Sequence, residues 1–165
     1  MVVCAEIAII IMKVMVEFWS QFLQNKVIWI TLLSWFIAQG SKITLGVIRT
    51  KRFNFSWVLG TGGMPSSHSA ATTSLAVCIG IESGFASPLF AVSFLFAMVT
   101  MFDAQTWRRS IGFQARILNR IVDDLHNGKA ISDEPLRELV GHTPVEVFVG
   151  AVIGVIVPIL LYHKG

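Results

Sequence analysis

The sequence predicts an all-α integral membrane protein, a bundle of about five or six helices that includes one amphipathic surface helix. Two observations carry this prediction. Hydrophobic residues make up 54% of the 165 residues and charged residues only 14%, whereas a soluble domain carries about 25% charged residues. Several apolar stretches also approach the roughly 20 residues that a membrane-spanning helix needs. Because a surface so poor in charge would aggregate in water, lipid is the expected solvent.

The N-terminal residues 1–22 are expected to form a helix, from about Val2 to Phe22, ahead of a membrane domain of residues 23–165. Lys13 and Glu17 interrupt its apolar run. This helix could therefore span the membrane or lie on its surface.

Four apolar segments follow. Val27 to Ile48 is long enough, at 1.5 Å per residue, for a hydrocarbon core of about 30 Å. Residues from Phe53 to Met64 are rich in Gly, Asn and Ser and predict a loop. Pro65 to Ile81 and Pro88 to Phe102 predict a hairpin of two helices, each only just long enough to span. Pro144 to Leu161 is the last span, and its small residues permit close helix contacts. These small residues are Gly150, Ala151 and Gly154.

The segment from Asp103 to His126 has a different character. Its apolar residues recur at helical spacing on one face, which predicts an amphipathic helix along the membrane surface or packed over the bundle. They are Trp107, Ile111, Ala115, Leu118, Val122 and Leu125. Asn127 to Gly141 is a polar connector.

The basic residues indicate an orientation. If the hairpin forms, the segments Lys42–Met64 and Asp103–Thr143 lie on one side of the membrane and hold ten of the thirteen Lys and Arg residues. The ten are Lys42, Arg49, Lys51, Arg52, Arg108, Arg109, Arg116, Arg120, Lys129 and Arg137. The positive-inside rule places this side in the cytoplasm. A site that binds phosphate would also need cations, which is a second explanation for the excess of Lys and Arg on this side.

Composition also argues against other classes. The net charge of +3 is small, and basic and aromatic residues are not interleaved, so no nucleic-acid partner is expected. Cys4 and Cys78 lie in apolar runs and read as small buried residues. His126 and His163 look incidental, and no metal-ligand spacing is present, so no metal or cofactor is expected.

The first candidate site segment is Gly62-Gly63-Met64-Pro65-Ser66-Ser67-His68-Ser69. Gly63 would let the backbone approach a ligand closely. Pro65 suits the first turn of a helix, and Ser66 and Ser67 would offer hydroxyls and free N–H groups to an anion there. His68 could act as a general acid or base. The alternative is an ordinary loop-to-helix junction with a polar cap.

Lys42 and Arg49 are seven residues apart, about two helical turns, so they project from one face. As an alternative they are interfacial anchors, which suits Arg49 better than the deeper Lys42. Asp103 stands near Arg108 and Arg109, and these arginines could hold a phosphate by bidentate hydrogen bonds or face lipid headgroups.

His142 and Glu146 are four residues apart at the start of the last span. There, Glu146 could fix the tautomer of the imidazole and stabilise its cation, which is the support that a histidine nucleophile needs. A Glu in the first turn is also a good helix cap, which is the alternative reading.

Together these motifs resemble the superfamily of type-2 phosphatidic acid phosphatases and vanadium haloperoxidases. Its Lys-x6-Arg-Pro motif matches Lys42 and Arg49, with Thr50 in place of Pro. Its Pro-Ser-Gly-His motif matches residues 65–68, with Ser67 in place of Gly. The end of its third motif matches His142 and Glu146, with Glu in place of Asp.

A narrower resemblance covers about Asn25 to Leu160. The strings Gly-Gly-Met-Pro-Ser-Ser-His-Ser, Asp-x4-Arg-Arg and Gly-His-Thr-Pro-x-Glu-Val are similar to those of a divergent family of small membrane proteins related to that superfamily. The superfamily arginine expected at Leu136 is absent, and Arg137 is off by one, a rotation of roughly 100° on a helix. Arg108 or Arg109 is our candidate for the missing cation.

The resemblance implies a metal-independent lipid phosphate phosphatase with a phosphohistidine intermediate. His142 would be the nucleophile, Glu146 would orient it and His68 would be the acid and base. The phosphate would be held by the remaining site residues, Lys42, Arg49, Gly63, Ser66, Ser67, Asp103, Arg108 and Arg109. Expected partners are the bilayer, a membrane lipid substrate and further copies of the chain in a homo-oligomer. The alternatives are a non-catalytic lipid-phosphate-binding or scaffold protein and, less favoured, a transporter component.

Overall fold

The computed structural model describes residues 2–53, 55, 63–125 and 141–162, with only the backbone described for 2–5, 8–9, 107–109 and 123–125. These residues form helices, with no strand among them. The helices are α1 (Val2–Gln24), α2 (Lys26–Thr50), α4 (Ser67–Ser83), α5 (Pro88–Gln105), α6 (Trp107–Leu125) and α7 (Pro144–Leu161). The all-α membrane fold is therefore confirmed. By length and composition, α2, α7 and the run from Pro88 to Val122 could each cross a membrane.

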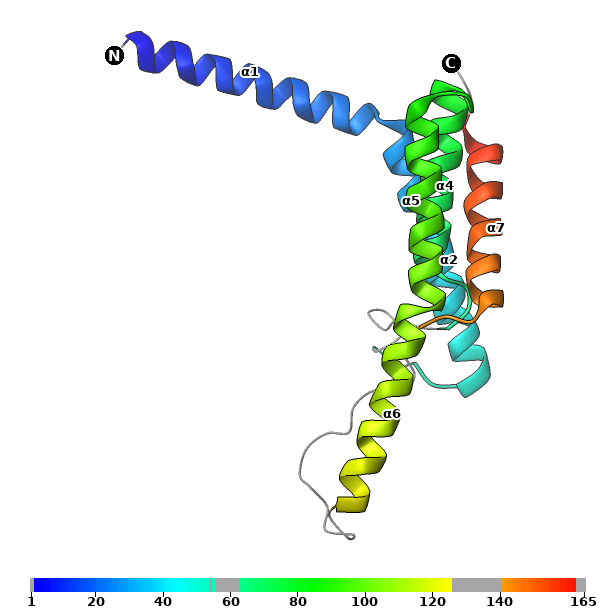
Figure 1. Ribbon diagram of the computed structural model, residues 1–165. Helices are drawn as coiled ribbons and strands as arrows, with labels where there is room; N and C mark the ends of the chain where they lie inside the picture. The colour runs from blue at the N-terminus through cyan, green and yellow to red at the C-terminus, as the bar shows by residue number, and fades with distance from the viewer. Residues whose placement is uncertain (1, 54, 56–62, 126–140, 163–165) are drawn as a thin grey trace.

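Helix α4 forms the centre of the bundle, and α2, α5 and α7 all pack against it (Figure 1). Its buried residues are small, and they are Ser67, Ser69, Ala70, Thr72, Ser74, Ala76, Cys78 and Gly80. Small side chains let helix backbones approach closely, which drives helix association in lipid, where apolar burial contributes little. Ser74 is part of this packing, because its Oγ lies 2.9 Å from the Oγ of Ser34 on α2.

The closest approach is between α4 and α7. A Cβ added to Gly150 would lie 2.3 Å from the carbonyl oxygen of Ser66, and one added to Gly154 would lie 2.4 Å from that of Ala70. Both are closer than a real Cβ comes to a backbone oxygen, so these positions must be glycine at this spacing. The predicted close contacts along α7 are confirmed.

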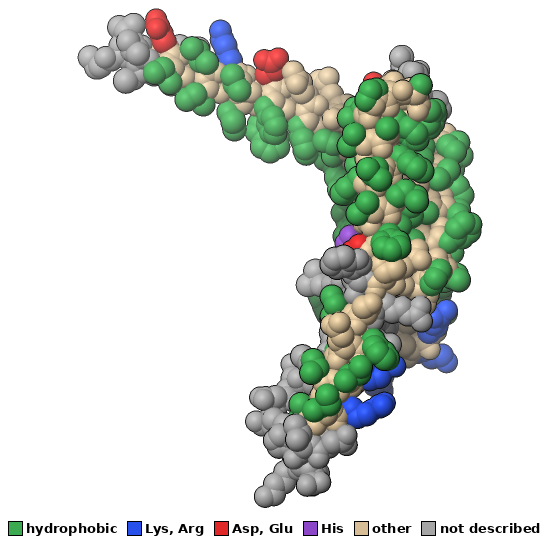
Figure 2. Space-filling view, viewed as in Figure 1, with side chains coloured by type: hydrophobic (Ala, Val, Ile, Leu, Met, Phe, Trp, Pro, Cys, Tyr) green, Lys and Arg blue, Asp and Glu red, His purple; other side chains and the backbone are tan. Residues whose placement is uncertain are grey.

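The four bundle helices alternate in direction, so their ends form two groups. The end of α2, the start of α4, the end of α5 and the start of α7 meet at one end, which we call the site end (Figure 1). At the other end the side-chain hydroxyl of Tyr162 donates to Glu82, which joins α7 to the end of α4. The predicted grouping of the two basic segments on one side is confirmed for the described residues, and Figure 2 shows Lys and Arg gathered there.

Two expectations about the elements need correction. Helix α4 begins at Ser67 with Ser66 as its N-cap, so Pro65 precedes the helix and does not lie in its first turn. Helix α6 does not pack over the bundle. It continues beyond the end of α5, and α5 is the only described helix that it contacts (Figure 1). The expected loop of residues 53–64 and the connector of residues 127–141 lie mostly outside the described residues.

Helix α1 stands apart from the bundle. It leaves α2 at Asn25 and runs sideways, across the direction of α4 and α5 (Figure 1). Beyond its junction with α2 it contacts no other described helix. It therefore adds nothing to the site end and is treated separately below.

Candidate functional site

The pair His142–Glu146 lies at the start of α7. Nδ1 of His142 is 3.1 Å from Oε2 of Glu146, and the imidazole is buried, with the residue only 5% exposed. A carboxylate can only accept hydrogen bonds, so an ionised Glu146 requires the proton on Nδ1. The lone pair is then on Nε2, which is the tautomer that a histidine nucleophile needs.

The same carboxylate also caps the helix. Oε2 of Glu146 accepts from the N–H of Thr143 at 3.1 Å, and Oγ1 of Thr143 accepts from the N–H of Glu146 at 3.3 Å. This is a complete capping box. The capping reading of Glu146 is therefore confirmed, and its role beside a histidine nucleophile stays a prediction, because one oxygen contacts both the imidazole and the helix end.

The start of α4 is bound to the start of α7 by the backbone. The N–H of Ser66 donates to the carbonyl oxygen of Glu146 at 3.0 Å, and Oγ of Ser66 accepts from the N–H of Ser69 at 3.4 Å. Ser66 is fully buried. The expectation that Ser66 offers a free N–H to an anion is therefore wrong, since its N–H is bound to α7, while its Oγ caps the start of α4.

Lys42 faces this junction from α2. It is partly buried and is attracted electrostatically by Glu146. Gly63 lies beside it with φ of +85°, and a Cβ there would be 3.4 Å from Cε of Lys42. The positive φ and the close lysine both favour glycine at this position. Lys42, Gly63 and Glu146, which are far apart in sequence, thus belong to one cluster.

The end of α5 completes the site end. The backbone N–H of His142 donates to the carbonyl oxygen of Ala104 at 3.0 Å. Asp103 is the neighbour of Ala104 and is partly buried. The hydrogen bond holds His142 against α5, so the histidine is fixed by its backbone on one side and by its imidazole on the other.

The remaining predicted residues are placed less closely. His68 is the second residue of α4 and is exposed, while Ser67 is 6% exposed. Arg49 is exposed on the last turn of α2, about 10 Å along the helix from Lys42 at 1.5 Å per residue. Arg108 and Arg109 have their backbone in the first turn of α6, one turn beyond Ala104 and Asp103. Their side chains, like Gly62, Leu136 and Arg137, lie outside the described part.

Sequence reasoning missed one contributor. Ala104 anchors His142 through a carbonyl group, and no sequence pattern reports such a bond. Gly150, which was expected to permit close helix contacts, lets α7 approach Ser66, as the spacing Gly150-x-x-x-Gly154 indicates. The pattern Thr143-x-x-Glu146 likewise predicts the capping box.

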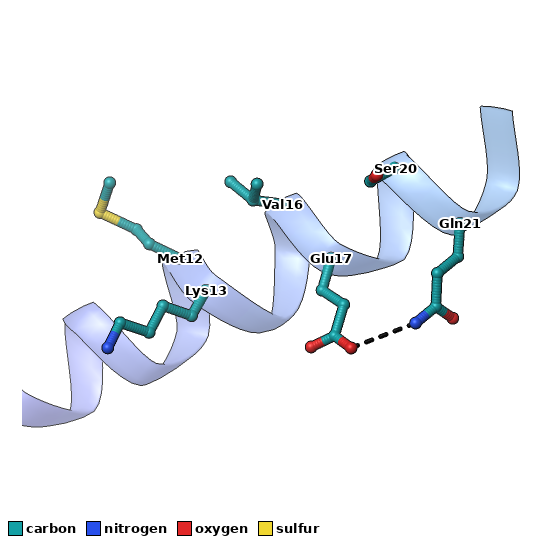
Figure 3. A pocket seen from close by; sticks show the side chains of 6 residues that line it. All are labelled: Met12, Lys13, Val16, Glu17, Ser20 and Gln21. Carbon is teal, nitrogen blue, oxygen red and sulfur yellow. Dashed lines mark hydrogen bonds between the residues drawn. The ribbon is translucent and has the colours of Figure 1, made fainter. Parts of the chain in front are cut away.

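No other cluster competes with this one among the described residues. The hollow drawn in Figure 3 is lined by Met12, Lys13, Val16, Glu17, Ser20 and Gln21, all from α1, so it is one face of a single helix and encloses no ligand. The described residues also contain no group of three or more His, Cys, Asp or Glu side chains placed to hold a metal ion.

A family profile described as the divergent PAP2 family matches residues 23–157. The chain belongs to the divergent PAP2 family. This confirms the resemblance carried by the motifs, and the profile begins near the C-terminal end of α1. The chain is also similar to YuiD of Bacillus subtilis (strain 168), described as an uncharacterized membrane protein. The two are 42% identical over 137 residues, which is 76% of this chain and 87% of that protein. No solved structure matches the chain significantly. As a divergent PAP2 family member with several apolar helices, the protein is an integral membrane protein.

Proposed function

We propose that this protein is a membrane lipid phosphate phosphatase that works through a phosphohistidine intermediate on His142. The observation that carries the proposal is the contact between Nδ1 of His142 and Oε2 of Glu146 at the site end. A fixed tautomer and an adjacent carboxylate are what a histidine nucleophile needs. Membership of the divergent PAP2 family supports the same chemistry.

In the proposed reaction, Nε2 of His142 attacks phosphorus and the bond from phosphorus to the lipid oxygen breaks. His68 gives its proton to that leaving oxygen. A water molecule then attacks the phosphohistidine, His68 takes the proton from this water, and inorganic phosphate leaves with the imidazole restored. Glu146 stabilises the imidazole while it carries positive charge.

The negative charge that develops on the phosphate is stabilised by groups from several elements. Lys42 interacts electrostatically with Glu146, and Arg49 lies on the same face of α2. The hydroxyl of Ser67 and the backbone at Gly63 add uncharged donors. Ser66 is left out, because its N–H is already bound to Glu146.

The Asp103 segment supplies our candidate for the missing superfamily arginine. Arg108 and Arg109 follow Ala104 by about one helical turn, and Ala104 holds the backbone of His142. We propose that one of these arginines reaches the phosphate, with Asp103 close to them on the same helical run.

The predicted orientation of the site end in the membrane indicates the substrate class. The basic site end would face the cytoplasm under the positive-inside rule. Phosphatidylglycerophosphate and phosphatidic acid, which present a phosphomonoester at that face, are therefore favoured over a polyprenyl diphosphate. A homo-oligomer is compatible with this proposal but is not needed for it.

A second function has its own support. His142 and Ser66 are buried, and Nδ1 of His142 and the backbone N–H groups of both residues are engaged within the protein, which also suits a lipid-phosphate-binding or scaffold protein without catalysis. The arginine missing from the third motif, Ser67 in place of Gly and Glu146 in place of Asp point the same way.

The deciding experiment is phosphate release by purified protein in detergent. Each candidate lipid is tested with the wild type, with His142→Ala, and with Lys13→Ala as a control on the remote helix α1. Activity that only His142→Ala abolishes, with a labelled acid-labile phosphoenzyme in the wild type, supports the phosphatase. Equal background release in all three proteins, together with lipid binding, would support the binding function instead.

A further inference from the structure

Helix α1 carries a narrow polar stripe along its length. Glu6, Lys13, Glu17, Ser20 and Gln24 follow at intervals of seven, four, three and four residues, which places them on one face. Ile10 interrupts the stripe, and Gln21 borders it. The stripe satisfies part of its own hydrogen bonding, because Gln21 donates to Glu17 at 3.1 Å (Figure 3). Gln24 likewise donates to Ser20 at 3.3 Å.

The opposite face of α1 is apolar and uncovered. Ile11, Met15, Phe18 and Phe22 follow at intervals of four, three and four residues, and the first three are 56%, 50% and 55% exposed. Figure 2 shows the charged side chains on one edge of α1, and hydrophobic side chains on the edge that faces along the bundle toward its site end. The apolar face of α1 therefore points toward the level of the membrane that the apolar surface of the bundle occupies.

The junction between α1 and α2 is braced. The indole N–H of Trp29 donates to the carbonyl oxygen of Leu23 at 2.9 Å, and its ring meets Phe22 edge to face at 6.1 Å between centroids. Asn25 caps the start of α2 through its side chain. The sideways course of α1 is thus held by specific contacts on both sides of the bend.

Aromatic side chains gather at this bend. Trp19 contacts Phe18 and Phe22, and Phe22 contacts Trp29. Trp residues are enriched where membrane proteins pass from hydrocarbon to headgroups, because the ring is apolar and the N–H is polar. The bend lies at the end of the bundle opposite the site end, beside the Tyr162–Glu82 contact.

We propose that α1 lies in the headgroup layer of the leaflet opposite the His142–Glu146 pair, with its apolar face in the acyl chains and its polar stripe in water. A helix that crossed the bilayer would run along the bundle, whereas α1 runs across it. A second copy of the chain could cover the apolar face, but that face continues the apolar surface of the bundle, so lipid is its natural cover. The proposal stands apart from the phosphatase function.

The charges of the polar stripe indicate which lipids α1 would bind. Glu6, Lys13 and Glu17 give the described stripe two acids and one base, so anionic headgroups would not attract it. Burial of the apolar face must then supply the binding. We expect α1 to associate equally with vesicles of neutral phosphatidylcholine and with vesicles that also contain anionic phosphatidylglycerol.

The test is a cysteine scan of α1 in the full chain, with Cys4→Ala as the parent and the buried Cys78 retained. Single cysteines from position 6 to position 24 are labelled with a membrane-impermeant maleimide in intact cells and in inverted vesicles. Ser83→Cys, exposed at the end of α4, marks the side of the bend, and Arg116→Cys, on α6, marks the site end.

The expected labelling rate oscillates with the helical period of about 3.6 residues. Lys13→Cys, Glu17→Cys and Ser20→Cys react fast and from the side of Ser83→Cys, while Met15→Cys and Phe18→Cys are protected. Reaction of Glu6→Cys from the side of Arg116→Cys would show that α1 crosses the membrane and would overturn the proposal. Uniform labelling, or disulfide cross-links between two copies through Met15→Cys, would overturn it as well.

A matched pair of charge insertions adds a second test. In the Met15→Cys reporter, Phe18→Glu puts a charge on the apolar face, and Ser20→Glu puts the same charge on the stripe. Phe18→Glu should expose the reporter to the maleimide, and Ser20→Glu should leave it protected. Equal effects of the two variants would show that the apolar face is not in lipid.

Discussion

Oε2 of Glu146 accepts two hydrogen bonds, one from Nδ1 of His142 and one from the N–H of Thr143, both at 3.1 Å. The start of α7 and the tautomer of the histidine therefore depend on the same atom. Because the helix needs this carboxylate for its cap, the position of the imidazole is set by folding and not by a ligand.

Replacing Glu146 with Gln should separate its two duties. The amide oxygen can still accept from Thr143 and from Nδ1, so the fold and the tautomer are kept, but the negative charge is lost. We expect kcat to fall on the order of 10²- to 10⁴-fold with little change in thermal stability. Glu17→Gln, on α1, is the matched control and should keep full activity. Full activity of Glu146→Gln would mean that the carboxylate charge has no part in the reaction.

His68→Ala should show whether His68 is the proton donor. A lipid alkoxide needs protonation as it leaves, so loss of the acid should lower the rate by about 10²- to 10⁴-fold. An aryl phosphate with an acidic leaving group needs no such proton, and its phosphoenzyme should form almost as fast as in the wild type. His142→Ala should fail with both substrates. If His68→Ala loses both reactions equally, its assignment as the acid is wrong.

Arg108 and Arg109 are expected to replace the arginine that the third motif lacks. The double change to Ala should weaken inhibition by vanadate or phosphate and lower kcat/KM by about 10²-fold, the usual effect of losing one charged stabiliser. Arg116→Ala and Arg120→Ala change the same helix further from Ala104 and serve as controls. Undiminished activity in the double variant would dismiss both arginines, and equal losses in the controls would indicate a general charge effect.

Gly150→Ala should destabilise the bundle. Its Cβ would lie 2.3 Å from the Ser66 carbonyl oxygen, so α4 and α7 must separate, and overpacking of this kind typically costs about 1–3 kcal/mol. Gly40→Ala, on α2, is the matched control, because nothing lies within 4 Å of its Cβ position. Thermal unfolding in detergent should show a lower midpoint for Gly150→Ala only. Equal midpoints would mean that the helices are not packed this closely.

Much of the fold could be predicted because its signals are local. The composition indicates a membrane protein, and the α7 boundaries, Pro144 and Leu161, were predicted correctly. A proline at the first helical position and a capping box mark that start clearly. The start of α4 was predicted two residues too early, because Pro65, Ser66 and Ser67 can all begin a helix. Ser66 is the N-cap in the structure, where its N–H donates to the carbonyl oxygen of Glu146.

The pairing of His142 with Glu146 was within reach of the sequence, because residues four apart meet at the start of a helix whatever surrounds them. The roles of Ser66, Ala104 and Gly63 were not, because they depend on partners about 20 to 80 residues away that only helix packing brings together. The direction of α1 also depends on tertiary contacts. The residue spacing predicts its polar stripe, but the contacts of Trp29 with Phe22 and Leu23 across the bend set its direction. Spacing along a chain sets which side chains share a face, whereas the partner of a buried polar group is chosen by the tertiary fold.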